Sequence, residues 1–216
     1  MPPGVLNLII LNVIMFVVKL FAETKLIDLD YLLGLHHPFS PDFHFYQYIT
    51  SMFMHGDFSH ILFNMFGLWI FGQLLENAYG TKRFLIFYLV SGVGASLIYQ
   101  IWISINQYNN FVGDVPGIIE ALQTYPPGGL LIGASGAVYG IMMGAALLFP
   151  NTEMYMMFIP IPVKLKWLAV FYGGAELLRG FQQADGDNVA HFAHIGGMIF
   201  GFILVKIYSR SKNHFY

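Results

Sequence analysis

The sequence predicts an all-α polytopic membrane protein whose fold is a bundle of six transmembrane helices. Of the 216 residues, 56% are hydrophobic and 10% are charged, whereas about 25% are charged in ordinary soluble domains. The mean hydropathy is +0.61. A soluble protein of this composition could not cover its apolar surface with polar side chains, so we expect the chain to lie in a lipid bilayer.

Six apolar segments predict the helices, because a membrane span needs about 20 mostly apolar residues. They lie at residues 5–21, 58–76, 82–105, 135–149, 166–180 and 191–208. The first has neither a basic start nor a small-residue cleavage site, so we expect a retained span rather than a signal peptide. Together the segments predict a single membrane domain over residues 1–216, with long connections at 22–56 and 106–129.

Basic residues near the ends of the spans predict the orientation, since they accumulate on the cytoplasmic side. Seven lie on one side: Lys82, Arg83, Lys164, Lys166, Lys206, Arg210 and Lys212. Three lie on the other: Lys19, Lys25 and Arg179. The majority side is predicted to be cytoplasmic, which places both termini inside and the long connections outside.

Charge and cysteine content exclude several classes of partner and chemistry. The net charge is −2, without a block of basic residues, so nucleic acid is not an expected partner. The absence of cysteine removes disulfides, thiolate nucleophiles and thiolate metal sites.

Four polar side chains fall at one depth near the predicted outer face. Ser135 opens the fourth span, His194 lies in the first turn of the sixth, and His60 and Asn64 lie in the first two turns of the second. Polar side chains within spans are costly and mark functional sites by default. The fourth span is short, about 22 Å against a hydrocarbon core of about 30 Å. Ser135 is therefore expected to lie below the outer surface, with residues 128–134 as irregular backbone lining a cavity.

Glycines predict a close contact between the fourth and sixth spans. Gly136, Gly140 and Gly144 repeat at an interval of four on one span, as do Gly197 and Gly201 on the other. Such repeats allow helix backbones to approach closely in lipid. Since His194 precedes Gly197 by three residues, this contact would carry it to Ser135. The alternative is that these glycines serve packing alone.

A serine beside a histidine suggests nucleophilic catalysis. The imidazole can take the hydroxyl proton while the oxygen attacks a carbonyl. Spans two, four and six carry no acidic residue at this depth, so we expect a dyad rather than a triad. The backbone N–H of Ser135 at a helix N-terminus, with His60 and Asn64, would supply donors to an oxyanion.

Three separated motifs give the chain a specific resemblance. These are His60-Ile61-Leu62-Phe63-Asn64, then Gly133-Ala134-Ser135-Gly136 with Tyr139, then Ala193-His194-Ile195-Gly196-Gly197 with Gly201. In order and spacing they resemble the rhomboid family of intramembrane serine proteases, over nearly the whole chain.

The resemblance implies a rhomboid-like bundle in which Ser135 is the nucleophile, His194 the base, and His60 and Asn64 the oxyanion-hole donors. It also implies that Tyr139 packs on the His194 ring, with the motif glycines supporting the site. One departure is Tyr46-Gln47, where the family often has Trp-Arg in its first loop. This puts the stability of that loop in question rather than the chemistry.

The polar residues allow two other interpretations. His55, His60, His191 and His194 could suggest a metal site, but no HExxH motif or acidic ligand accompanies them, so no metal or other cofactor is expected. Glu176 and Arg179, three residues apart near the outer end of the fifth span, suggest a local ion pair.

The expected function is therefore an endopeptidase that cleaves transmembrane segments of other membrane proteins near the outer face. The alternatives are a catalytically silent relative that binds membrane-protein clients, and a small transporter. A transporter would be expected to show internal repeats and a polar site at the midplane, and the sequence shows neither feature. The six-span core resembles bacterial forms, so we expect the bacterial inner (cell) membrane.

Overall fold

The computed structural model describes residues 1–110, 116–117, 130–156, 159–182 and 189–212. Most of residues 111–129, in the second long connection, therefore lie outside the described part. Six helices of the described residues cover the six predicted segments, and each boundary agrees to within a few residues. They are α1 (Pro3–Glu23), α4 (Phe58–Tyr79), α5 (Thr81–Asn110), α7 (Ser135–Leu148), α8 (Leu165–Gln182) and α9 (His191–Lys212).

Four of these helices, α1, α4, α5 and α9, are long and apolar enough to cross a membrane. The chain is therefore an integral membrane protein. Helix α7 has only 14 residues, about 21 Å at 1.5 Å per residue. Helix α8 carries three charged residues, Lys166, Glu176 and Arg179. Membrane passage of α7 and α8 stays a prediction, as does the side on which the termini lie.

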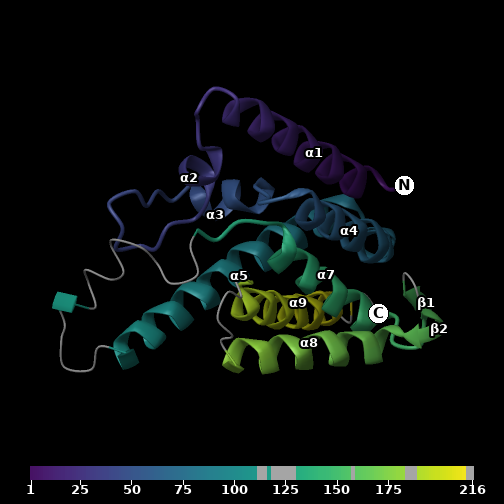
Figure 1. The fold of residues 1–216 in the computed structure, drawn as a ribbon. Helices are drawn as coiled ribbons and strands as arrows, with labels where there is room; N and C mark the ends of the chain where they lie inside the picture. Colours follow the sequence, from purple (N-terminus) through teal and green to yellow (C-terminus); the bar gives the residue numbers. More distant parts are fainter. Residues whose placement is uncertain (111–115, 118–129, 157–158, 183–188, 213–216) are drawn as a thin grey trace.

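The short helix α7 lies at the centre of the bundle, where it contacts α4, α5, α8 and α9. Helix α9 in turn contacts α5, α7 and α8 (Figure 1). Large side chains from α5, such as Phe87 and Tyr88, are fully buried around this centre. In lipid there is little hydrophobic driving force between helices, so close packing holds such a bundle together.

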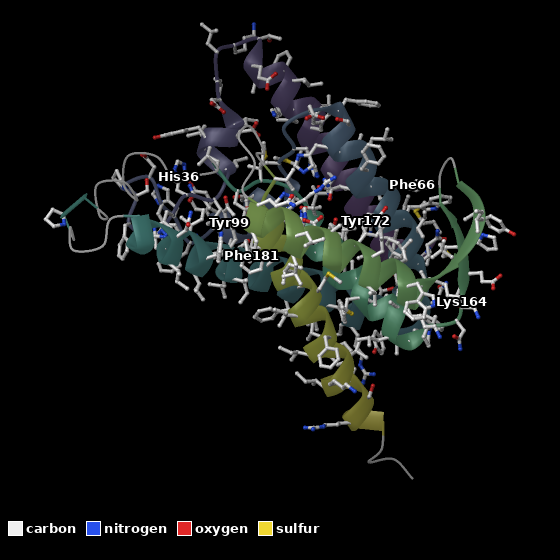
Figure 2. All side chains as sticks on the ribbon, turned by 60° about the horizontal axis from the view of Figure 1, so that its bottom comes forward. His36, Phe66, Tyr99, Lys164, Tyr172 and Phe181 are labelled. Atoms are coloured by element: carbon white, nitrogen blue, oxygen red, sulfur yellow. The ribbon has the colours of Figure 1, made fainter. Side chains whose placement is uncertain are left out.

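A β-hairpin joins α7 to α8, which the all-α prediction did not anticipate. Strand β1 (Glu153–Met156) pairs antiparallel with β2 (Ile159–Lys164), with Glu153 opposite Lys164. The second strand alternates isoleucine or valine with proline, a sequence that favours extended backbone and disfavours a helix. The hairpin, marked by Lys164, and the first loop, marked by His36, lie at opposite ends of the molecule (Figure 2).

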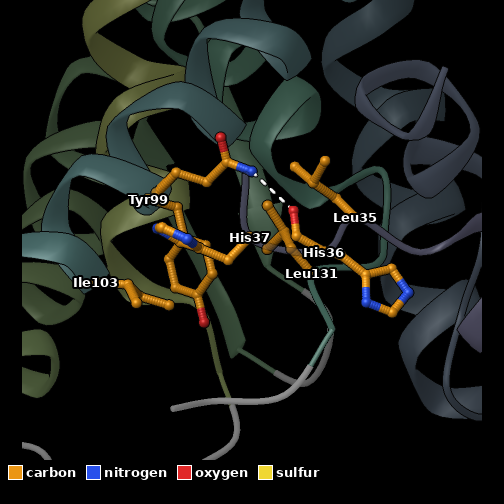
Figure 3. A pocket seen from close by; sticks show the side chains of 7 residues that line it. Leu35, His36, His37, Tyr99, Ile103 and Leu131 are labelled. Carbon is orange, nitrogen blue, oxygen red and sulfur yellow. Dashed lines mark hydrogen bonds between the residues drawn. The ribbon is translucent and has the colours of Figure 1, made fainter. Parts of the chain in front are cut away.

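The first loop contains α2 (Leu29–Leu33), α3 (Gln47–Thr50) and the 3₁₀ helix η1 (Ser51–Phe53). Gln47 is buried, and its side-chain oxygen accepts hydrogen bonds from the backbone N–H groups of His36 and His44. Gln100 on α5 donates to the carbonyl oxygen of His36 at 3.1 Å, beside a small pocket (Figure 3). Gln47 therefore joins two segments of the first loop by hydrogen bonds. It does so at the position where the resemblance leads one to expect an arginine.

Candidate active site

Ser135 and His194 face each other at the start of two helices. Ser135 is the first residue of α7, and His194 lies in the first turn of α9. The side-chain oxygen of Ser135 lies 2.7 Å from Nε2 of His194, a hydrogen-bond distance. His194 is buried, with 8% of its surface exposed, while Ser135 is half-buried. The two most important residues of the predicted site are thus in direct contact.

A close approach of α7 and α9 brings them together. A Cβ atom at Gly197 would lie 1.9 Å from the carbonyl oxygen of Gly136, and one at Gly201 would lie 2.3 Å from that of Gly140. Neither distance leaves room for a side chain. These four glycines therefore form the predicted helix contact, which begins beside Ser135 and His194. The third glycine of the α7 repeat, Gly144, does not take part, because a Cβ atom there would meet Phe87 of α5 and Leu75 of α4.

Tyr139 covers one face of the histidine. Its ring stacks on the His194 ring with centroids 4.2 Å apart and planes 5° from parallel. This is the contact that the family resemblance implied. Because Tyr139 lies one turn after Ser135 on α7, the stacking limits rotation of the imidazole away from the serine.

The turn before Ser135 packs on the histidines of the α4 entrance. Gly133 has a φ of +117°, a backbone conformation that residues with a side chain rarely adopt. A Cβ atom there would lie 2.6 Å from Nε2 of His60. The next residue, Ala134, donates its backbone N–H to Nε2 of His55 at 3.5 Å. Burial and the nearby charge of His60 lower the pKa of His55, which precedes α4, to about 3, so His55 is a neutral acceptor.

His60 and Asn64 lie one turn apart near the start of α4. Asp57 caps this helix by accepting the backbone N–H of His60 at 2.8 Å. Asn64 is buried, and its amide nitrogen donates to the carbonyl oxygen of His60 at 2.9 Å. Further along, a Cβ at Gly67 would lie 2.8 Å from Val138, so α4 packs closely on α7. The structure brings His60 against the turn before the serine, whereas the Asn64 amide bonds within its own helix.

Sequence analysis missed a carboxylate at the site, that of Glu176 on α8. Oε2 of Glu176 lies 2.6 Å from Nδ1 of His191 and 2.9 Å from Nδ1 of His194. Oε1 accepts a hydrogen bond from the Tyr139 hydroxyl. The described contacts do not include the expected ion pair with Arg179, which is exposed.

The depth of Glu176 was a usable signal. The expectation of a dyad rests on the spans predicted to begin at the outer face, which carry no acidic residue at this depth. The last turns of α8 lie beside the first turns of α9, as the contacts of Glu176 with His191 and His194 show. The statement that no acidic residue accompanies the histidines is therefore wrong.

The same cluster is the group of side chains that could hold a metal ion. Ligand atoms of Glu176, His191 and His194 lie within 4.8 Å of one another. Among the described residues, His55 and His60 are not part of this group. They pack on each other instead, with ring centroids 5.0 Å apart. In the structure the carboxylate and the imidazoles of the cluster contact one another directly, and the other nitrogen of His194 faces Ser135.

Fold and site together define a polytopic helical membrane protein with a partly buried serine–histidine contact between two helices. Residues 42–211 match the family model of the rhomboid domain. The match covers more than half of the chain, which therefore belongs to the rhomboid family.

Relatives agree with this assignment. The chain is 32% identical to RHOMBOID-like protein 12, mitochondrial, of Arabidopsis thaliana, over 89% of this chain and 54% of that protein. It is 27% identical to Rhomboid protease AarA of Providencia stuartii, over 76% of this chain and 56% of that protein. It is 29% identical to Rhomboid protease GluP of Bacillus subtilis, over 73% and 25% respectively. The chain thus spans about half the length of these relatives or less.

Proposed function

We propose that this protein is an intramembrane serine endopeptidase that cleaves transmembrane segments of other membrane proteins near the outer face. The observation that carries the proposal is the 2.7 Å contact between the Ser135 oxygen and Nε2 of His194. It lies inside a helical membrane protein of a family that includes relatives named as proteases.

The proposed reaction has two halves. Ser135 attacks the carbonyl carbon of the scissile peptide bond while Nε2 of His194 takes the hydroxyl proton. The tetrahedral intermediate collapses, and His194 returns that proton to the leaving amine. Water, with its proton taken by the same nitrogen, then hydrolyses the acyl-enzyme and frees Ser135.

The oxyanion of the intermediate needs hydrogen-bond donors. The first N–H groups of a helix have no partner within the helix, so the backbone N–H of Ser135 is one proposed donor. His60 and Asn64 are the other two, supported by the contact of His60 with Gly133. Asn64 would have to exchange its bond to the His60 carbonyl for one to the oxyanion.

Substrate and setting are further parts of the proposal. A half-buried serine beside glycines favours small side chains at the cleaved position and a substrate helix that unwinds easily. The partners are transmembrane-protein substrates and the lipid bilayer, without nucleic acid and without a metal ion. The proposed topology is one domain over residues 1–216 with six spans and both termini in the cytoplasm.

The bacterial inner membrane is the proposed location, on the strength of the resemblance of the core to bacterial forms. The relatives include proteins of Bacillus subtilis and Providencia stuartii, while several others are named mitochondrial or chloroplastic. Fractionation of cells that express the gene natively would test this part separately from the chemistry.

Cleavage by the purified protein in proteoliposomes tests the function. A panel of single-span substrates with small residues near the outer face should be cut by the parent chain and not by Ser135→Ala. Ser209→Ala is the matched control, because Ser209 lies at the far end of α9 and bonds only within its helix in the described contacts. No cleavage of any substrate by well-folded parent protein would favour the catalytically silent, client-binding alternative.

A further inference from the structure

Glu176 is a buried acid on a helix that the reaction described above does not use. It lies two turns from the end of α8, with 8% of its surface exposed. Burying a carboxylate is costly unless its charge is paired and its oxygens accept hydrogen bonds. The partners of this carboxylate therefore indicate what it does.

All of its described partners come from α7 and α9. Oε1 accepts the hydroxyl of Tyr139, the residue whose ring stacks on His194. Oε2 lies between two imidazoles, 2.6 Å from Nδ1 of His191 and 2.9 Å from Nδ1 of His194. The carboxylate thus contacts the histidine at the nitrogen opposite the one that faces Ser135.

That position bears on the tautomer of His194. An imidazole can accept the serine proton at Nε2 only while Nε2 is unprotonated, so its other proton must lie on Nδ1. A carboxylate beside Nδ1 favours this tautomer and stabilises the imidazolium that forms when the serine proton arrives. The 2.9 Å approach of Oε2 to Nδ1 is a close contact with the carboxylate charge and not a hydrogen bond, so the effect is mainly that of the charge.

We infer that Glu176 is a positioning residue for the base, which makes the site a Ser135–His194–Glu176 arrangement whose acid comes from α8. This inference rests on the proposed protease function. The hydrogen bond to Tyr139 sets the carboxylate, and the stacked Tyr139 ring sets the plane of the imidazole. Packing of α8 against α7 and α9 is then a condition for full activity.

The decisive variant is Glu176→Gln, which keeps the size of the side chain and an acceptor for Tyr139 but removes the charge. We expect kcat to fall about 10²-fold, less than the about 10⁴-fold found when an orienting carboxylate with a well-aligned bond is neutralised in other serine proteases. KM should stay within about twofold, since the residue acts on the chemical step and not on substrate binding. Glu176→Asp should recover part of the rate. Glu153→Gln, the same change on the exposed strand β1, is the matched control and should behave like the parent.

These measurements separate the inference from its premise. If the parent cuts substrates and Glu176→Gln equals it in kcat, the inference is wrong while the protease function stands. If kcat and thermal stability of Glu176→Gln fall together and Glu176→Asp recovers neither, the residue serves structure only and the inference is again wrong. If the parent shows neither cleavage nor reaction with fluorophosphonate, the premise itself fails. A selective loss of kcat at parental thermal stability, with partial recovery in Glu176→Asp, supports the inference.

Discussion

Gly197 of α9 lies directly against Gly136 of α7, so close that a Cβ atom at position 197 would stand 1.9 Å from the Gly136 carbonyl oxygen. The same helix segments carry His194 and Ser135. The geometry of the candidate catalytic pair therefore depends on a backbone contact that tolerates no side chain.

Gly197→Val should abolish the proposed protease activity through a structural change. The branched side chain would force α9 away from α7, and a displacement of about 1 Å at reacting groups can reduce a rate on the order of 10²-fold. Overpacking of this kind also costs about 1–3 kcal/mol of stability. The measurement is cleavage in proteoliposomes paired with thermal unfolding in detergent.

Gly174→Ala is the control for this variant. Gly174 lies on α8, and a Cβ atom there would meet nothing within 4 Å. It should keep parental stability and activity. Full activity and unchanged stability of Gly197→Val would show that the α7–α9 contact is not required.

Much of this fold could be predicted from sequence because membrane spans are long apolar segments. The start of α4 at Phe58, of α7 at Ser135 and of α9 at His191 each agree with the predicted start. The glycine repeats also identified the α7–α9 contact, since only glycine permits that approach. The β-hairpin was not anticipated, because its strands of four and six residues lie in the connection between two predicted spans and are too short to show a clear strand pattern.

The site residues that stand in sequence motifs could be predicted. The residue that stands in no motif and has its partners on other helices could not. Ser135 and His194 stand in motifs, so their meeting could be expected. Glu176 stands in no motif, and its nearest charged neighbour, Arg179, suggested a local ion pair. Its true partners are far away in sequence and are brought close only by the packing of α8 on α7 and α9.

Asn64→Ala should slow cleavage without abolishing it. Loss of one oxyanion donor typically reduces kcat by about 10²–10³-fold, while the proposed donors His60 and the Ser135 backbone N–H would remain. Steady-state kinetics of the variant give the test. Because Asn64 bonds to the His60 carbonyl, a parental kcat would show that the amide serves α4 alone.

Chelators should leave the rate unchanged. Glu176, His191 and His194 are close enough to share an ion, but the proposed mechanism needs His194 as a free base rather than as a ligand. We expect full activity in EDTA and in phenanthroline, and inactivation by serine-directed reagents. Loss of activity in chelator that added zinc restores would instead identify a metalloenzyme.

His55 should make the fold sensitive to acid. Burial and the charges of His60 and Lys19 lower its pKa to about 3 in the folded protein, while an unfolded histidine titrates near about 6.5. Unfolding therefore takes up a proton between these values, and stability falls as pH drops below about 6.5, by up to about 1.4 kcal/mol per pH unit.

The thermal midpoint at about pH 7 and about pH 5 measures this effect. The decrease should be smaller in His55→Gln than in the parent. His44→Gln, which changes an exposed histidine of the first loop, should keep the parental decrease. An equal decrease in His55→Gln and the parent would show that another group causes the acid sensitivity.

The central claim is that His194 activates Ser135 as a nucleophile, and covalent labelling tests it most directly. Purified protein is treated with a fluorophosphonate, and the modified peptide is located by mass spectrometry. We predict that the parent is labelled at Ser135. The variants Ser135→Ala and His194→Ala should not be labelled, although a cooperative thermal unfolding transition shows that both are folded. Absence of label in folded parent protein, or equal labelling of the Ser135→Ala variant, would contradict the account.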